Sequence, residues 1–165
     1  MDDGYNNSGT SRDYAYLRAT GVNDPSVITE RLNIDPDRSY MLGDLMPAKK
    51  GRTTLKYRQS LWRLNSQLAD TDPLEQHVNT LLSRVVTQRS VLLELQEFFA
   101  FQIVCVSTGG NFSFVTSLEM QRLATACGFT FWFDIYPDSE PHEKLQALQE
   151  QLDAALDNID EQDVS

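Results

Sequence analysis

The segment FTFWFDIY (residues 129–136) alternates more cleanly than any other part of the chain. In a β-strand its side chains would form two sets on opposite faces, Phe129, Phe131, Phe133 and Ile135 on one and Thr130, Trp132, Asp134 and Tyr136 on the other. Such a strand belongs in a sheet that packs one face against helices and leaves the other face partly in water.

The stretch before this strand predicts a hairpin and a helix. Residues 101–107 are rich in β-forming side chains, and a glycine-containing turn at residues 108–111 leads to a short strand at residues 112–114. A capping box at Thr116-Ser117-Leu118-Glu119 then begins a helix, which Gly128 ends.

The first half of the chain predicts the same mixture of elements. We expect a first strand at residues 14–20, a helix beginning at Asp24-Pro25, and two strands at residues 39–42 and 57–64. A second helix should begin at Asp72, with Asp72 and Glu75 forming a capping box. Its inner face would consist of Val78, Leu81, Leu82 and Val85, and a polar break at residues 87–90 would separate it from a helical piece at 91–98. Together these elements predict an α+β fold, a mainly antiparallel sheet with helices packed on one face, ferredoxin-like or related.

Composition divides the chain into three parts. Residues 1–11 are polar and predict a flexible leader, residues 12–137 form the α+β domain, and residues 138–165 predict an acidic C-terminal helix and tail. The net charge is −10, and nine acidic residues face one lysine after Pro137. The apolar residues of the last segment recur at 3-4 spacing and predict a homodimer seam through Leu145, Leu148, Leu152 and Ile159.

No apolar run reaches the ~20 residues needed to span a bilayer, and the N-terminus lacks the pattern of a secretory signal. These observations predict a cytoplasmic protein. Cys105 and Cys127 stand among apolar residues, so we expect buried, unreactive thiols.

Catalytic and metal-binding patterns are absent from the sequence. His77 and His142 are the only histidines, and neither lies in a nucleophile motif. Glu150, Asp153 and Asp157 share a helix face, for which a solvated surface is the better account than a metal site. We therefore expect no catalytic residues, no metal and no cofactor.

Basic residues concentrate in the middle of the chain and predict a candidate anion- or partner-binding loop. The residues concerned are Lys49, Lys50, Arg52, Lys56 and Arg58. The loop lacks the phosphate-binding P-loop pattern, and a solvated surface loop is the competing interpretation. The acidic tail is one candidate partner for it, whereas the overall negative charge argues against nucleic acid.

Trp132, Asp134 and Tyr136 form a second candidate surface on the polar face of the last strand. Aromatic side chains mixed with polar ones are typical of interface hot spots, although packing at the rim of the core would also explain them.

Several segments recur together in a pattern that resembles a known family. They are Leu17-Arg18-Ala19-Thr20-Gly21, Asp35-Pro36-Asp37-Arg38-Ser39, Ser60-Leu61-Trp62-Arg63-Leu64, Leu74-Glu75-Gln76-His77-Val78 and Phe131-Trp132-Phe133-Asp134-Ile135-Tyr136. Residues 12–137 are similar to the bacterial family catalogued as domain of unknown function 4279. The resemblance implies a bacterial cytosolic α+β domain and brings no catalytic residues with it.

Three function classes remain open at this point. The preferred hypothesis is a non-enzymatic protein-binding module, for example an immunity-type inhibitor of a toxin. A small-molecule enzyme or ligand sensor would use Asp44, Arg63 and Asp134, the polar groups in or beside apolar strands. A structural assembly module would use the C-terminal seam.

Overall fold

The computed structural model describes residues 12–47, 54–108 and 113–136. The elements follow one another along the chain as β1 (Arg12–Gly21), α1 (Ser26–Leu32), β2 (Arg38–Tyr40), β3 (Ser60–Asn65), α2 (Leu74–Val85), the 3₁₀ turn η1 (Val86–Gln88), α3 (Arg89–Leu95), β4 (Phe99–Thr108), α4 (Leu118–Ala126) and β5 (Thr130–Tyr136).

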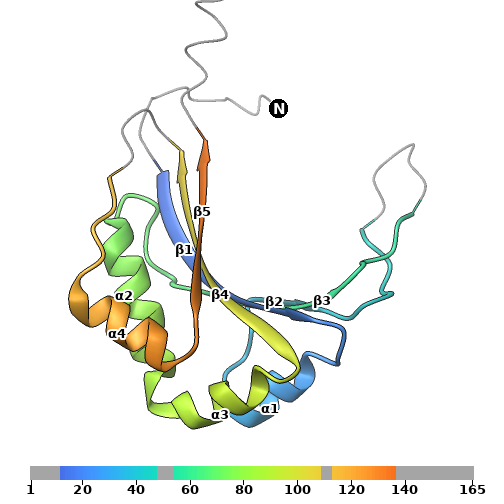
Figure 1. The fold of residues 1–165 in the computed structure, drawn as a ribbon. Helices are drawn as coiled ribbons and strands as arrows, with labels where there is room; N and C mark the ends of the chain where they lie inside the picture. Colours follow the sequence, from blue (N-terminus) through green and yellow to red (C-terminus); the bar gives the residue numbers. More distant parts are fainter. Residues whose placement is uncertain (1–11, 48–53, 109–112, 137–165) are drawn as a thin grey trace, which may run out of the picture.

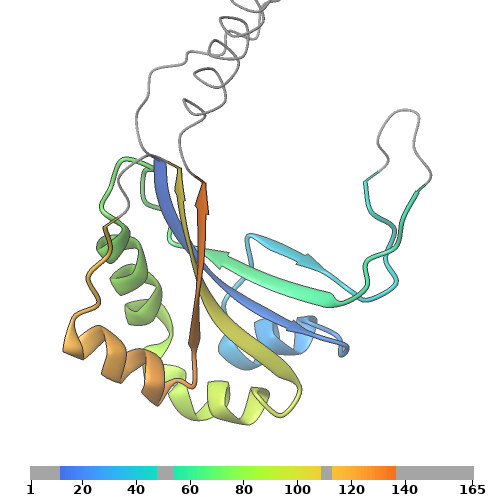
Figure 2. The same ribbon diagram turned by 45° about the horizontal axis from the view of Figure 1, so that its top comes forward.

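The strands form one sheet in the order β2-β3-β1-β4-β5. All neighbouring pairs are antiparallel except β4 and β5, which run parallel. The helices cover one face of this sheet, and the other face is open and concave (Figures 1 and 2). The predicted α+β class, with a mainly antiparallel sheet and helices on one face, is therefore confirmed. The ferredoxin-like arrangement is not confirmed, and the acidic C-terminal helix lies outside the described residues.

Alternation within the strands places the core between sheet and helices. Leu17 of β1, Trp62 of β3 and Ile103 of β4 are fully buried and belong to one core cluster. The indole Nε1 of Trp62 donates a hydrogen bond of 3.1 Å to Thr29 Oγ1 on α1, which satisfies its only polar atom. The predicted inner face of α2 is confirmed, since Val78, Leu81, Leu82 and Val85 are all buried.

One of the three predicted helix starts has the expected cap residue. The side chain of Asp24 accepts a hydrogen bond from the Ser26 N–H at 2.9 Å, and this bond lowers the pKa of the Asp24 carboxyl. At α2 the prediction was wrong, because Asp72 accepts from the Ala69 N–H and Glu75 accepts from the Val115 N–H.

The cap of α4 lies one residue later than expected. Ser117 rather than Thr116 accepts from the Met120 N–H, at 3.1 Å. The Thr116 hydroxyl instead accepts a hydrogen bond of 2.8 Å from the Gln121 side chain. The two hydroxyl residues are adjacent, so local sequence could not decide between them.

The predicted hairpin after residue 107 was wrong. Both neighbours of β4 are other strands, β1 on one side and β5 on the other. Ser113 and Phe114 belong to no strand. The Phe114 ring instead packs against Phe131 and Phe133 of β5, at centroid distances of 6.4 and 5.6 Å. The predicted polar break at residues 87–90 is likewise helical, because η1 leads directly into α3.

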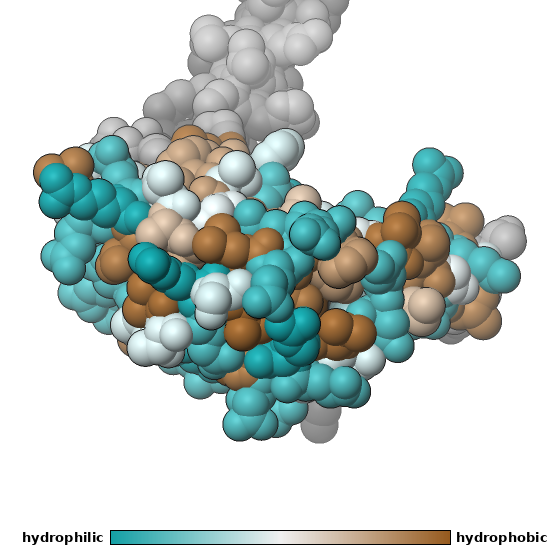
Figure 3. All heavy atoms as spheres, turned by 60° about the horizontal axis from the view of Figure 1, so that its bottom comes forward, coloured by the Kyte–Doolittle hydropathy of each residue, from teal (hydrophilic) through white to brown (hydrophobic). Residues whose placement is uncertain are grey.

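A projecting arm, formed by residues 41–47 and 54–59, replaces the outer parts of two predicted strands. Its two sides are joined by hydrogen bonds such as Met46 N–H to Leu55 O, at 2.8 Å, and by a bridge between Leu45 and Lys56. The arm extends from the end of β2 and β3, on the side of the sheet away from β5 (Figures 1 and 2). Leu45 and Leu55 are more than 60% exposed, at 64% and 63%, and give the arm a hydrophobic surface (Figure 3, right).

Candidate binding face

Three arginines form a single row across the open face of the sheet. Arg38 of β2 lies directly opposite Arg63 of β3, and Arg63 lies directly opposite Arg18 of β1. The row continues to Gln102 of β4, which is paired with Arg18. Opposite residues on neighbouring strands have Cβ atoms about 5 Å apart, so three positive charges are concentrated on a narrow strip, the arginine row.

Each guanidinium of the arginine row lies over an aromatic ring. The distances from the guanidinium carbon to the ring centroid are 5.5 Å for Arg18 over Trp132, 5.5 Å for Arg38 over Tyr40 and 3.7 Å for Arg63 over Tyr16. Such cation–π contacts contribute roughly 0.5–1 kcal/mol at exposed sites. They hold the cations against the sheet without neutralising them.

Hydrogen bonds orient the three side chains further. Arg18 donates from Nε and Nη2 to Gln102 Oε1 at 2.9 and 2.7 Å. Arg63 donates from Nε to Asn65 Oδ1 at 2.7 Å, and Arg38 donates to the Tyr57 hydroxyl at 3.2 Å. All three acceptors are neutral. Among the described residues the recorded ion pair joins Arg31 and Glu94, and no carboxylate pairs with the arginine row.

The open face has an apolar base beside the arginine row. Val104 and Val106 are 1% and 3% exposed, although they point away from the helices and stand outside the core cluster. Val104 lies between Tyr16 and Trp132 in the strand register, and Val106 lies between Tyr14 and Asp134. The rings of Tyr14 and Tyr16 also stack on each other, with centroids 6.4 Å apart. The low exposure of Val104 and Val106 shows that this part of the face is a packed surface.

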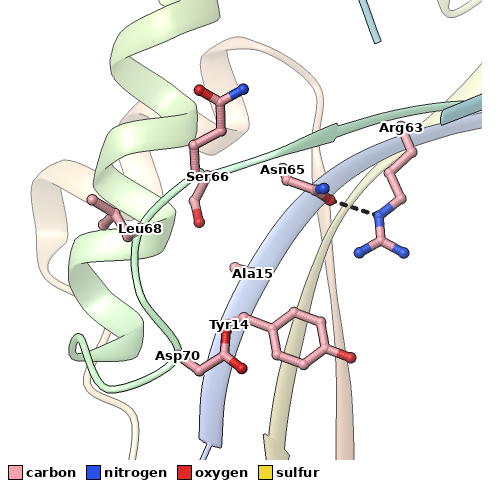
Figure 4. A pocket seen from close by; sticks show the side chains of 8 residues that line it. Tyr14, Ala15, Arg63, Asn65, Ser66, Leu68 and Asp70 are labelled. Atoms are coloured by element: carbon pink, nitrogen blue, oxygen red, sulfur yellow. Dashed lines mark hydrogen bonds between the residues drawn. The ribbon is translucent and has the colours of Figure 1, made fainter. Parts of the chain in front are cut away.

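A hollow of about 290 Å³ opens at one end of this face, where β3 leads into α2 (Figure 4). Its lining includes Tyr14, Arg63, Asn65, Ser66 and Asp70. In Figure 4 the Nη groups of Arg63 point away from Asn65. A planar pair of N–H donors in this arrangement suits a carboxylate or phosphate.

His77 is completely buried beneath this hollow and has a structural partner on each ring nitrogen. Its Nδ1 lies 2.5 Å from Ser66 Oγ, and its Nε2 lies 3.1 Å from the Ala69 carbonyl oxygen. Because a carbonyl only accepts, Nε2 carries a proton, and in the neutral imidazole Nδ1 then accepts from the serine hydroxyl. The pair ties the loop after β3 to α2, so His77 has a packing role.

The basic loop is described only in part. Lys49, Lys50 and Arg52 lie outside the described residues, whereas Lys56 and Arg58 line a hollow of about 400 Å³ on the arm. The same hollow includes Tyr40 and Tyr57, whose rings stack with centroids 3.5 Å apart. Through Tyr40 and Tyr57 this hollow adjoins Arg38 of the arginine row.

The second predicted set lies on the opposite end of the open face, on β5. Trp132 contacts Arg18 as described, and the Tyr136 hydroxyl donates to Asp134 Oδ2 at 2.9 Å. This hydrogen bond raises the pKa of the Tyr136 hydroxyl, because losing its proton would place two negative charges side by side. Asp44 has a local role: its side chain accepts from the Met41 N–H at 2.7 Å and shapes the turn of the arm.

The sequence patterns indicated no binding role for most of this face. The residues concerned are Tyr14, Tyr16, Arg18, Arg38 and Tyr40. The alternation of Tyr14, Tyr16 and Arg18 on the first strand was a usable signal for an aromatic and basic strand face. The alignment of Arg18 with Arg63 and Arg38 could be predicted only from the strand order.

Membrane-spanning helices and metal-binding clusters are both absent from the described ranges. No helix there is both long enough and apolar enough to cross a membrane. Nor does that part of the chain contain a group of three or more His, Cys, Asp or Glu side chains that could hold a metal ion.

Comparison with known proteins identifies a family. No curated protein and no solved structure matches the chain. A family model does match over residues 10–138, most of the chain, and its description is a domain of unknown function. The protein belongs to the DUF4279 family, as its motifs indicated.

Proposed function

We propose that this protein is a non-enzymatic protein-binding module and that its open sheet face contacts an acidic surface of the partner. The arginine row is the observation that carries this proposal. Like charges directly opposite each other on a sheet are unfavourable. This fold places three arginines in register, and each of them is held by neutral groups. A partner that supplies carboxylates would relieve their repulsion most.

The residue types on the face support a protein partner. Trp, Tyr and Arg are the side chains most enriched in interface hot spots, because each buries a large area and still offers a polar group. Trp132 is 52% exposed and Tyr136 is 53% exposed, so both have area left to bury. Arginine adds paired donors that match a carboxylate.

An immunity-type inhibitor is one version of this proposal. Its simplest electrostatic form, an acidic protein neutralising a basic toxin groove, does not use the arginine row. If the open face is the contact surface, the toxin must present acidic side chains to it. The nine acidic residues after Pro137 are the part of the sequence that would suit a basic surface.

A small-molecule site built from Asp44, Arg63 and Asp134 is less well supported. Asp44 shapes the arm, Arg63 is on β3 and Asp134 is on β5. Arg63 is level with Thr130 in the strand register, three strand spacings away. Asp134 lies four residues further along β5, so the positions of Arg63 and Asp134 are roughly 20 Å apart. The assembly hypothesis rests on Leu145, Leu148, Leu152 and Ile159, which lie outside the described residues and stay a prediction.

Affinity capture with charge-matched variants tests the proposal. The full-length tagged chain, the double variant Arg18→Gln/Arg63→Gln and the control Arg89→Gln/Arg122→Gln would each be used to capture proteins from the native host. The control removes the same two charges from exposed positions on α3 and α4. We expect a stoichiometric protein with the wild type and the control and its loss with the open-face variant.

The salt dependence provides a second readout. Attraction between exposed charges is screened at higher ionic strength, so binding should weaken as salt is added. Equal capture by all three chains would refute the arginine row as the contact, and a clean preparation from the wild type would refute a stable protein partner.

A further inference from the structure

The arginine row runs across the strands of the sheet rather than along one of them. Arg38, Arg63, Arg18 and Gln102 lie directly opposite one another on β2, β3, β1 and β4. Neighbouring strands are about 4.8 Å apart, so the backbone positions of Arg38 and Arg18 are separated by roughly 10 Å. A partner segment that contacts the whole row must therefore present its carboxylates at intervals close to the strand spacing.

An α-helix that lies across the strands has this spacing, whereas an extended segment does not. A helix rises 1.5 Å per residue, so side chains at positions i, i+3 and i+7 of one face span about 10.5 Å. An extended segment directs alternate residues to one side at intervals of about 6.8 Å, and three of them span about 14 Å. Three successive positions on a helix face therefore match the three arginines, and an extended segment overshoots them by about 4 Å.

Aromatic rings extend the contact area to both sides of the arginine row. Tyr16 and Trp132 are level with Val104, two residues along the strands on one side, whereas Tyr40 is two residues along on the other. Two residues of a strand correspond to about 7 Å, and a helix with its side chains is about 10–12 Å wide. One helix seated on the row would therefore reach the rings beside it, of which Trp132 is 52% exposed.

The guanidinium groups lean to both sides in the same way. Those of Arg18 and Arg63 lie over Trp132 and Tyr16, and that of Arg38 lies over Tyr40. A helix that follows the row would thus have a cation on each flank. Burying these cations without counter-ions would be costly, so charge complementarity favours an acidic helix over an apolar or basic one.

We propose that the partner's contact element is an amphipathic α-helix that lies across the strands on the concave open face (Figures 1 and 2). Its acidic residues would recur at three- and four-residue spacing beside apolar ones and would pair with Arg18, Arg38 and Arg63. A fourth position would meet Gln102, whose amide N–H groups can donate. The inference rests on the proposed function, since it specifies the acidic surface that the open face takes.

Binding of designed peptides to the purified full-length chain tests the helix. The probe is an alanine-based peptide of about 20 residues, with glutamates at positions i, i+4, i+7 and i+11 beside a stripe of leucines. One control peptide has the same composition, with the glutamates distributed around the helix. A second control keeps the stripe and carries a central proline, which breaks the helix.

We expect isothermal titration calorimetry to show that the striped peptide binds about tenfold more tightly than either control, because only this peptide can pair with three arginines at once. Arg18→Gln/Arg63→Gln should weaken its binding to the level of the controls. Arg89→Gln/Arg122→Gln, which removes the same charge from α3 and α4, should leave its binding unchanged.

The other outcomes separate this inference from the proposed function. Equal binding of all three peptides that Arg18→Gln/Arg63→Gln still weakens would overturn the helix and leave an acidic contact in place. Binding that this variant does not change would contradict both proposals. Binding of no peptide would overturn the helix. Binding that appears only after Glu150→Gln/Asp153→Asn/Asp157→Asn would also overturn it, because this chain's own acidic segment would then occupy the face.

Discussion

Arg18 and Arg63 lie directly opposite each other on β1 and β3, and each guanidinium rests on a different aromatic ring. The repulsion between opposite like charges on a sheet is of the order of 0.2–1 kcal/mol. One cation–π contact offsets about the same amount. The Arg18–Arg63 pair therefore adds little to the stability of the fold, and we expect its contribution to lie in binding a partner.

Replacing these two arginines should leave the protein folded. We expect Arg18→Gln/Arg63→Gln to change the free energy of unfolding by less than about 1 kcal/mol, because lost contacts with Trp132 and Tyr16 are offset by relief of repulsion. Urea denaturation monitored by circular dichroism measures the change. A loss of several kcal/mol in the free energy of unfolding would instead show that the arginine row stabilises the fold.

Ser66→Ala should lower the free energy of unfolding more than the removal of one hydroxyl group suggests. The serine hydroxyl is the partner of His77 Nδ1, and both side chains are buried. Removing it leaves a buried acceptor without a hydrogen bond, at a cost of about 1–3 kcal/mol. Ser83→Ala is the matched control, since Ser83 is exposed on α2 and bonds only to Thr80 O. Equal costs for the two variants, measured by urea denaturation, would contradict the role given to the Ser66–His77 pair.

Gly128→Ala should destabilise the protein more than Gly43→Ala. Both glycines have positive φ, 69° and 89°, so an alanine is strained at either site. At Gly128 a Cβ would also lie 2.3 Å from the Gln96 side-chain amide, which donates to Cys127 O. At Gly43 a Cβ would meet open space. We expect a loss of about 1 kcal/mol at position 43. At position 128 we expect a further ~1 kcal/mol, because the Gln96 side chain must move and give up its bond to Cys127 O. Thermal unfolding would rank the two variants, and the reverse order would be inconsistent with the contact at Gln96.

The two cysteines should be unreactive in the folded protein. Both are free and buried, and burial raises the pKa of the Cys105 thiol to about 12. The thiolate is the reactive form, so almost none is present at pH 8. A thiol reagent should label neither residue in the native state and both in urea. Rapid native labelling at pH 8 would show that Cys105 or Cys127 is accessible.

Local patterns were enough to find most elements and the fold class. The alternation in residues 129–136 and the helical spacing of Val78, Leu81, Leu82 and Val85 depend only on neighbouring residues, and the structure contains both. The hairpin after residue 107 failed for a non-local reason. Both edges of β4 are taken by strands distant in sequence or separated from it by a helix.

The binding face could be predicted only in fragments. Trp132, Asp134 and Tyr136 share one strand, so their common face followed from alternation. Arg18, Arg38 and Arg63 are 20 and 25 residues apart along the chain, and only the strand order β2-β3-β1 aligns them. The capping residues show the same limit, since Glu75 bonds to Val115, forty residues away.

Site-specific photo-cross-linking in the native host tests the central claim most directly. A photoreactive phenylalanine would replace Tyr14, on the open face beside Arg63, or Leu93, which is 47% exposed on α3. The account predicts a covalent adduct with one protein from position 14, and its loss when Arg18 and Arg63 are also changed to Gln. Adducts from position 93 but not from position 14 would contradict the open face as the partner's contact surface.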